Sequence, residues 1–153
     1  MPTHYSGTPA EMRTLNTFIK LTRCTNSLVA RLTERNTLGD ITLSQFTVLE
    51  ALFHLGSMTQ GEVSTKVLKS GSNMTTVIDN LERDGLVRRE RDAKDRRVIH
   101  VHLTEAGQSK LDAVLPGHIA ALVEEFSILS VSEMDTLGNI CKKLGKGKGT
   151  KRV

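Results

Sequence analysis

The sequence predicts a mainly α-helical chain with one small β-hairpin, an α+β fold. Two observations support this fold class. Over most of the chain, apolar residues recur at intervals of three and four, which is the period of an amphipathic helix. Between residues 86 and 103 the side chains instead alternate in character with a period of two, as in a half-buried strand. The 153 residues suffice for one domain with a modest, mainly aliphatic core.

A long helix is expected from Glu11 to about Arg35. Its apolar residues form two adjoining stripes: Leu15, Phe18, Ile19, Leu21, Leu28, Val29 and Leu32. Such a wide apolar arc indicates that the helix packs on more than one partner. Gly39, in the break "NTLGDI", is the expected helix stop.

Two short helices are expected next, because capping boxes mark their first turns. Thr42 pairs with Gln45, and Thr59 pairs with Glu62, each at the spacing that satisfies two free backbone donors. The first of these helices extends to about His54. Its expected inward residues are Phe46, Leu49 and either Leu52 or Phe53. The second ends near Lys66 or Val67.

A third short helix follows a tight turn at Gly71. Ser70 or Ser72 is expected to cap it, and Gly85 is expected to end it as a C′ residue, with Leu86 packing back onto the helix. Its narrow apolar face consists of Met74, Val77, Ile78 and Leu81. Two consecutive helices joined by a tight turn form a helix-turn-helix layout.

The segments "LVRRER" and "RVIHVHL", joined by "DAKD", are predicted to form a β-hairpin. In the second segment, Ile99, Val101 and Leu103 lie on one face, and Val98, His100 and His102 lie on the other. A helix-turn-helix followed directly by a basic hairpin is a winged helix.

The remainder is expected to contain two more helices. Thr104 caps the first, with Glu105 in its first turn, and a kink or break is expected at Pro116. Ser130 and Glu133 form a third capping box, which opens the final helix.

The charge distribution gives weak evidence about partners. The pI is near 9.3, but residues 142–152 carry six basic and no acidic side chains, so the rest of the chain has 15 basic and 17 acidic residues (21 − 6 against 17). With Gly145, Gly147 and Gly149, this stretch is expected to be a flexible basic tail, or alternatively a loose phosphate-contacting arm.

Several protein classes are disfavoured. Cys24 and Cys141 have no CxxC spacing, the N-terminus lacks an apolar signal segment, and no run of 18 apolar residues occurs. The expected location is therefore the cytoplasm. No phosphate loop, GxSxG or HExxH motif is present, so the protein is predicted to be neither an enzyme nor dependent on a cofactor.

The winged-helix layout predicts binding to double-stranded DNA. The third short helix offers Ser72, Asn73, Thr75 and Thr76 to a major groove, where Asn reads adenine and Thr methyls contact thymine. The hairpin offers six cations, and an arginine at its tip suits a narrow minor groove: Arg88, Arg89, Arg91, Lys94, Arg96 and Arg97. Two plainer interpretations remain open: the Ser and Thr residues only cap the helix, and the hairpin is a solvated surface with weak ion pairs.

Acidic residues in the hairpin suggest a positioning role. Asp92 and Asp95 each repel phosphates, yet a carboxylate beside Arg97 can hold the guanidinium in a forked, pre-oriented pose. Asp95 is therefore predicted to fix the position of Arg97, although its negative charge weakens the attraction of the hairpin to DNA phosphates.

The segments "SGSNMTTVIDNLE" and "GLVRRERDAKDRRVIHVHLTEAG" resemble the MarR family of bacterial transcription regulators. The resemblance covers about residues 12–144. It implies a homodimer that reads a pseudopalindromic operator. Residues 1–41 would form a dimerisation helix and linker, 42–103 the winged DNA-binding lobe, 104–145 the C-terminal dimerisation helices, and 146–153 a flexible basic tail.

The resemblance also implies roles for single residues. Arg97 matches the wing-tip arginine and Asp95 the aspartate that positions it, while Ser70, Ser72, Asn73, Thr75 and Thr76 fall at the start of the recognition helix, and Arg88 lies in the wing.

Members of this family are commonly repressors released by a phenolic or other small aromatic ligand, or by cysteine oxidation. The segment "FIKLTRCTNSLVARL" is similar to a subgroup that responds to quinone-like electrophiles, which makes Cys24 a redox candidate, although a helical Cys also serves as a small core residue.

His100, His102 and His118 raise a metal hypothesis without supplying a complete ligand set, so no metal site is predicted. A winged helix that binds proteins instead of DNA is the remaining alternative.

Overall fold

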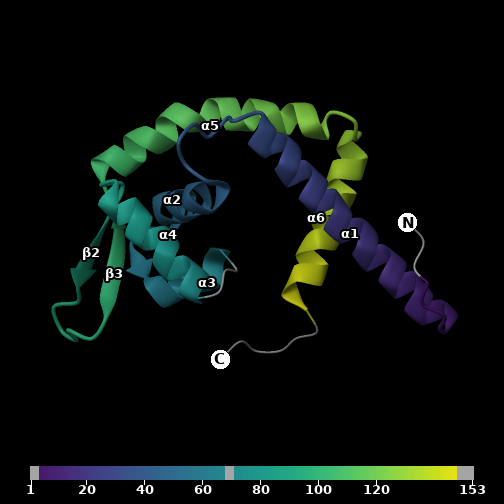
Figure 1. Ribbon diagram of the computed structural model, residues 1–153, viewed down its shortest axis with the longest axis horizontal. Helices are drawn as coiled ribbons and strands as arrows, with labels where there is room; N and C mark the ends of the chain where they lie inside the picture. Colours follow the sequence, from purple (N-terminus) through teal and green to yellow (C-terminus); the bar gives the residue numbers. More distant parts are fainter. Residues whose placement is uncertain (1–3, 68–70, 148–153) are drawn as a thin grey trace.

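The computed structural model describes residues 4–67 and 71–147. Their elements, in chain order, are α1 (Pro9–Glu34), α2 (Leu43–Leu55), β1 (Met58–Thr59), α3 (Gln60–Val67), α4 (Gly71–Arg83), β2 (Val87–Arg91), β3 (Ile99–Leu103), α5 (Glu105–Phe126) and α6 (Val131–Lys146). The predicted order of helices around one hairpin is confirmed. Figure 1 shows α2, α3, α4 and the hairpin gathered on one side, α5 running across the top, and α1 and α6 on the other side.

The hairpin is part of a three-stranded antiparallel sheet with the order β1-β3-β2. Arg89 of β2 pairs with Val101 of β3, and Met58 of β1 pairs with the same Val101 from the other side. The strand β1 was not predicted, because two residues are too few to show a period. The sequence did predict the hairpin, in which β2 and β3 pair antiparallel.

Capping boxes define four helix starts, three of which were predicted. The boxes at Thr42, Thr59 and Ser130 are all formed. The fourth is at Thr8, whose hydroxyl accepts from Glu11 N, so that α1 begins at Pro9 and not at Glu11.

Two glycines that were predicted to mark helix boundaries have other positions relative to the helices. The helix α1 ends at Glu34, as predicted to within one residue, but Gly39 is not its stop, because Asn36 already takes a positive φ of 49° and turns the chain. Gly71, predicted to form a tight turn before the helix, is instead the first residue of α4 as described, and Ser72 follows it in the first turn. Ser70 lies outside the described residues.

Two predictions about the C-terminal helices also need correction. Of the kink or break predicted at Pro116, the break is wrong: α5 continues through the proline, because residues buried on both sides of it, Leu111 and His118, hold the helix against the lobe. The helix α6 continues to Lys146, where lysines in its last turn favour the negative end of the helix dipole, so part of the predicted flexible tail is helical. Residues 148–153 of that tail lie outside the described residues.

The core lies within residues 41–111 and joins every element of the lobe. Its buried apolar residues are Ile41, Phe46, Val48, Leu49, Leu52, Met58, Val63, Met74, Ile78, Leu81, Leu86, Val87, Val101 and Leu111. The inward residue of α2 is therefore Leu52, while Phe53 is exposed.

The helices α1 and α6 leave most of their apolar side chains exposed. Leu32 is the one buried residue of α1 among those described, and α6 has none. The exposed apolar residues include Phe18, Leu21 and Val29 of α1, and Met134, Leu137, Ile140 and Leu144 of α6.

Within residues 4–67 and 71–147, no single helix has the length and apolarity needed to cross a membrane. The bent pair of α5 and α6, which meet at 105°, meets that length and composition only when taken together.

Candidate nucleic-acid interface

The first turns of α4 present the polar side chains that the sequence singled out. Asn73, Thr75 and Thr76 are exposed, while Met74 and Ile78, on the opposite side of the helix, are fully buried. The helix therefore offers a polar surface on a rigid support. Ser72 belongs to the same first turn.

The end of α4 fixes where the hairpin begins. Gly85 takes a φ of 73°, which suits glycine, and the amides of Gly85 and Leu86 donate to Glu82 O and Leu81 O at 2.9 Å. Thr104 Oγ1 donates to Gly85 O at 2.7 Å, and a Cβ added to Gly107 would lie 2.1 Å from Leu86 O. The "TEAG" segment thus needs its glycine so that α5 can pack directly on this turn.

Asp92 organises the tip of the wing, a role the sequence analysis missed. Its Oδ1 accepts from the amides of Lys94 at 2.8 Å and Asp95 at 2.9 Å, and these bonds hold the pKa of Asp92 below its usual value. An Asp at the start of a short turn is the sequence signal for such an Asx-type turn.

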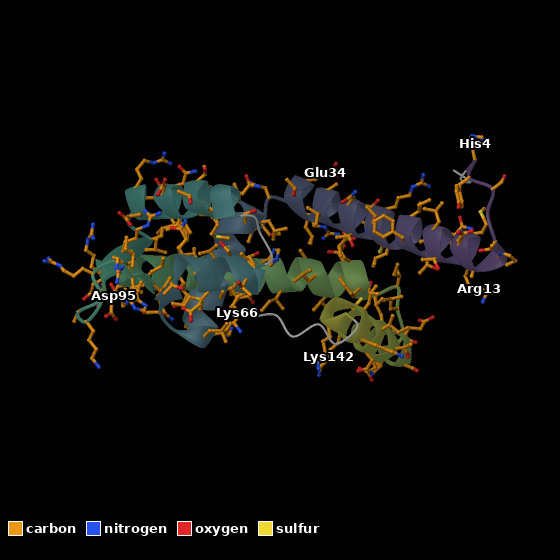
Figure 2. The ribbon with its side chains drawn as sticks, turned by 90° about the horizontal axis from the view of Figure 1, so that it is seen from below. His4, Arg13, Glu34, Lys66, Asp95 and Lys142 are labelled. Carbon is orange, nitrogen blue, oxygen red and sulfur yellow. The ribbon has the colours of Figure 1, made fainter. Side chains whose placement is uncertain are left out.

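Asp95 and Arg97 contact each other at that tip. Asp95 Oδ1 accepts from the Arg97 amide at 3.0 Å and lies 3.3 Å from Arg97 Nε. This is a single side-chain contact and not a fork of two parallel hydrogen bonds. The Arg97 side chain is 93% exposed, so its guanidinium extends into solvent. Figure 2 places Asp95 at one end of the molecule and Arg13 of α1 at the other.

The two arginines that begin the wing lie on opposite faces of β2. Arg88 is half-exposed and forms an ion pair with Glu90 on the same face. Arg89 points to the other face, where it pairs with Asp79 and Glu82 of α4. Within the described part of the chain, Arg91, Lys94 and Arg96 have no ion-pair partner.

The histidines do not form a metal centre in the residues described. His100 and His102 share a face of β3 with their ring centroids 6.5 Å apart. Nε2 of His100 lies 3.3 Å from Asp92, and Nδ1 of His102 lies 2.6 Å from Ser57 Oγ. No group of three or more potential ligands occurs among the described residues. The pair instead links β3 to the wing turn through Asp92 and to Ser57, the residue before β1.

His118 belongs to a cavity far along α5. This cavity of about 350 Å³ lies where the end of α1 and the 36–43 segment meet α5. Its lining is mainly apolar, with Leu32, Leu38, Ile41 and Leu43 beside the histidine. His118 Nδ1 lies 3.0 Å from Thr37 Oγ1, and the ring packs against Phe46 at 4.8 Å. Burial lowers the pKa of His118, so its imidazole is neutral at neutral pH.

Cys24 and Cys141 are both exposed free thiols, on α1 and α6 respectively. Exposure excludes the alternative that Cys24 is a core residue of the single chain. The proposed sensing role of Cys24 stays a prediction.

The fold and this surface together define a winged helix-turn-helix DNA-binding protein. The comparisons with known proteins agree. The model of the MarR family matches residues 41–99. The transcriptional regulator MhqR of Bacillus subtilis is 30% identical over 133 residues, which are 87% of this chain and 92% of MhqR. The chain belongs to the MarR family of transcription regulators.

Two solved structures share the fold, each with a TM-score of 0.79. Sco3205 of Streptomyces coelicolor, a MarR family regulator in complex with DNA, is 21% identical, and the match covers 97% of this chain and 94% of Sco3205. BpsR of Bordetella bronchiseptica, whose DNA binding is regulated by 6-hydroxynicotinic acid, is 22% identical, with coverage of 97% and 100%. At these identities the likeness concerns the fold.

Proposed function

We propose that this regulator binds a pseudopalindromic operator as a homodimer and represses transcription until a small aromatic ligand releases it. The observation that carries the proposal is the pairing of an exposed polar α4 with a wing whose Arg97 is almost fully exposed beside Asp95. In this arrangement Asn73, Thr75 and Thr76 read base edges in the major groove, and Arg97 enters the adjacent minor groove. Arg88 and the unpaired wing cations contact phosphates.

The exposed apolar faces of α1 and α6 support the homodimer. Large apolar side chains on both helices are more than a third exposed in the single chain, including Phe18, Leu137 and Ile140. An exposed apolar surface of this extent marks an interaction site. A second copy covers it, and its two-fold symmetry places two α4 helices about one turn of DNA apart. Residues 1–41 and 104–145 are then the dimerisation segments and 42–103 the DNA-binding lobe.

The cavity beside His118 is the proposed effector site. Its volume and apolar lining suit a single aromatic ring. A buried neutral imidazole accepts or donates one hydrogen bond, which suits a phenolic hydroxyl. The cavity touches α1, α5 and the 36–43 segment that enters the lobe. A ligand there would therefore bias the angle between the dimerisation helices and the lobe, and with it the separation of the two α4 helices. BpsR, which shares the fold, responds to a small aromatic acid.

The test begins with duplexes selected by the protein from a randomised pool. The wild-type protein should bind a selected duplex far more tightly than a random duplex at the same salt concentration, by about a thousandfold or more. Arg97→Ala should weaken operator binding by about tenfold, the effect of one lost charge-assisted contact. A protein that enriches no sequence, and whose DNA affinity is unchanged by Arg97→Ala, would not be a sequence-specific regulator.

A further inference from the structure

Arg89 differs from the other arginines of the wing. It occupies the face of β2 shared with the buried Val87, and its side chain is 22% exposed. Its Nη2 donates to Asp79 Oδ1 at 2.6 Å and its Nη1 donates to Glu82 Oε2 at 3.3 Å. Both carboxylates belong to α4. One guanidinium therefore ties the wing to the helix proposed to enter the major groove.

The same guanidinium continues into a chain of hydrogen bonds through α3. Arg89 Nη2 also lies 3.4 Å from Gln60 Oε1, and Gln60 Nε2 donates to Thr75 Oγ1 at 2.6 Å. Gln60 is the first residue of α3, and Thr75 is on the exposed side of α4. Residues from β2, α3 and α4 thus form one connected chain.

The donors and acceptors available fix the direction of each hydrogen bond in this series. A guanidinium only donates, so Gln60 must turn its oxygen toward Arg89. The amide nitrogen then faces Thr75, whose hydroxyl oxygen must accept. An oxygen held in this way fixes the χ1 angle of Thr75, and with it the position of the methyl group. Arg89 is thereby linked, through Gln60, to the way in which Thr75 is presented.

The charges around Arg89 are also unlike those of a phosphate-binding residue. Asp79 and Glu82 are about half-exposed on α4, where they would repel a DNA backbone. Arg89 offsets this repulsion, and the three side chains together carry a net charge of −1. Little of its positive charge is left to attract a phosphate.

We propose that Arg89 and Gln60 are positioning residues for sequence readout: they set α4 against the wing and orient Thr75 toward a base. The inference rests on the proposed function of α4 in the major groove. It assigns Arg89 to specificity, whereas Arg88, Lys94 and Arg96 contribute to general attraction.

The test uses substitutions that leave the net charge unchanged, so that general attraction to DNA stays constant. Gln60→Met removes both hydrogen bonds of the amide, and Arg89→Lys keeps the charge but removes the planar fork. Each should lower the ratio of operator to random-duplex affinity by about threefold to tenfold, as expected for the loss of one or two hydrogen bonds. Random-duplex affinity and its dependence on salt should not change.

Matched controls are available at sites outside this chain of contacts. Gln108→Met on α5 and Arg83→Lys at the end of α4 repeat the same chemical changes and should leave the ratio unaltered. Thermal melting of each variant verifies that the lobe is folded. Gln60→Met, at the half-buried start of α3, keeps the test informative even if Arg89→Lys unfolds the wing.

A double-mutant cycle tests the link to Thr75. Thr75→Val keeps the β-branched shape and removes the hydroxyl, so Gln60→Met should have little further effect in that background. An undiminished effect of Gln60→Met there would overturn the link. If wild-type protein discriminates operator from random DNA and both positioning variants discriminate equally well, the inference fails while the proposed function stands. If the wild-type protein does not discriminate at all, the proposed function itself fails.

Discussion

The lobe of residues 42–103 and the pair of helices α1 and α6 use similar apolar residues in opposite ways. In the lobe, Leu49, Ile78 and Val101 are completely buried by neighbours from the same chain. In α6, residues of the same kind at helical spacing, such as Leu137 and Ile140, remain exposed. A hydrophobic pattern at helical spacing therefore does not by itself show whether the same chain buries that face.

The largest expected effect is in the lobe. Leu49→Ala should lower the free energy of unfolding by about 2–5 kcal/mol, because it removes a fully buried side chain and leaves a cavity. Denaturant unfolding followed by circular dichroism measures this loss. Leu55→Ala, at an exposed position of the same helix, is the control and should cost well under half as much. Equal losses for the two variants would show that the lobe core is not packed as described.

The next largest effect is expected on the stability of the proposed dimer. Leu137→Glu places a charge in the exposed apolar face of α6, and we expect the dimer dissociation constant to rise by about a hundredfold, or about 2.7 kcal/mol. Sedimentation of the protein over a range of concentrations measures this change. Asn139→Glu introduces the same charge on the opposite side of α6 and should leave the dimer intact. A monomeric wild-type protein would contradict the proposed role of this face.

A smaller effect is expected at the wing. Asp95→Ala makes the wing more positive, yet it should weaken operator binding by about threefold to tenfold, because Arg97 loses both of its contacts with the carboxylate. Binding is measured at fixed salt concentration. Asp112→Ala, the same charge change on the exposed side of α5, is the matched control. Tighter binding by Asp95→Ala would show that net charge, and not orientation, governs the wing.

The smallest effect concerns the junction between the two regions. Burial lowers the pKa of His118 below its ordinary value of 6.5, so the unfolded chain binds the proton more tightly than the folded one. Stability from this group is complete above about pH 6.5 and is lost as the pH falls below it. His118→Gln should therefore show a smaller drop in melting temperature between about pH 7.5 and about pH 5.5. If the fall in melting temperature is the same in His118→Gln as in the wild type, His118 is not its source. His54→Gln, at an exposed site, is the control and should leave this fall unchanged.

The sequence by itself determined the order of the elements, because their signals are local. The capping boxes at Thr42, Thr59 and Ser130 satisfy backbone donors within their own first turn, and Gly85 supplies a backbone conformation that few residues adopt. The period of two in residues 99–103 likewise needs no distant partner to be recognised. The candidate residues Asn73, Thr75, Thr76 and Arg97 could be named for the same reason.

Only the tertiary structure decided features that depend on residues distant in sequence. Pro116 remains within a continuous helix because packing on both sides of it outweighs a local tendency to break. The strand β1 forms because Met58 pairs with Val101 of β3, which is distant in the sequence. Arg88 and Arg89 are neighbours of identical type, and the sequence gives them the same chemistry. The fold places Arg89 beside the carboxylates of Asp79 and Glu82 on α4, whereas Arg88 is half-exposed and pairs with Glu90 of its own strand, and this difference in surroundings separates their expected roles.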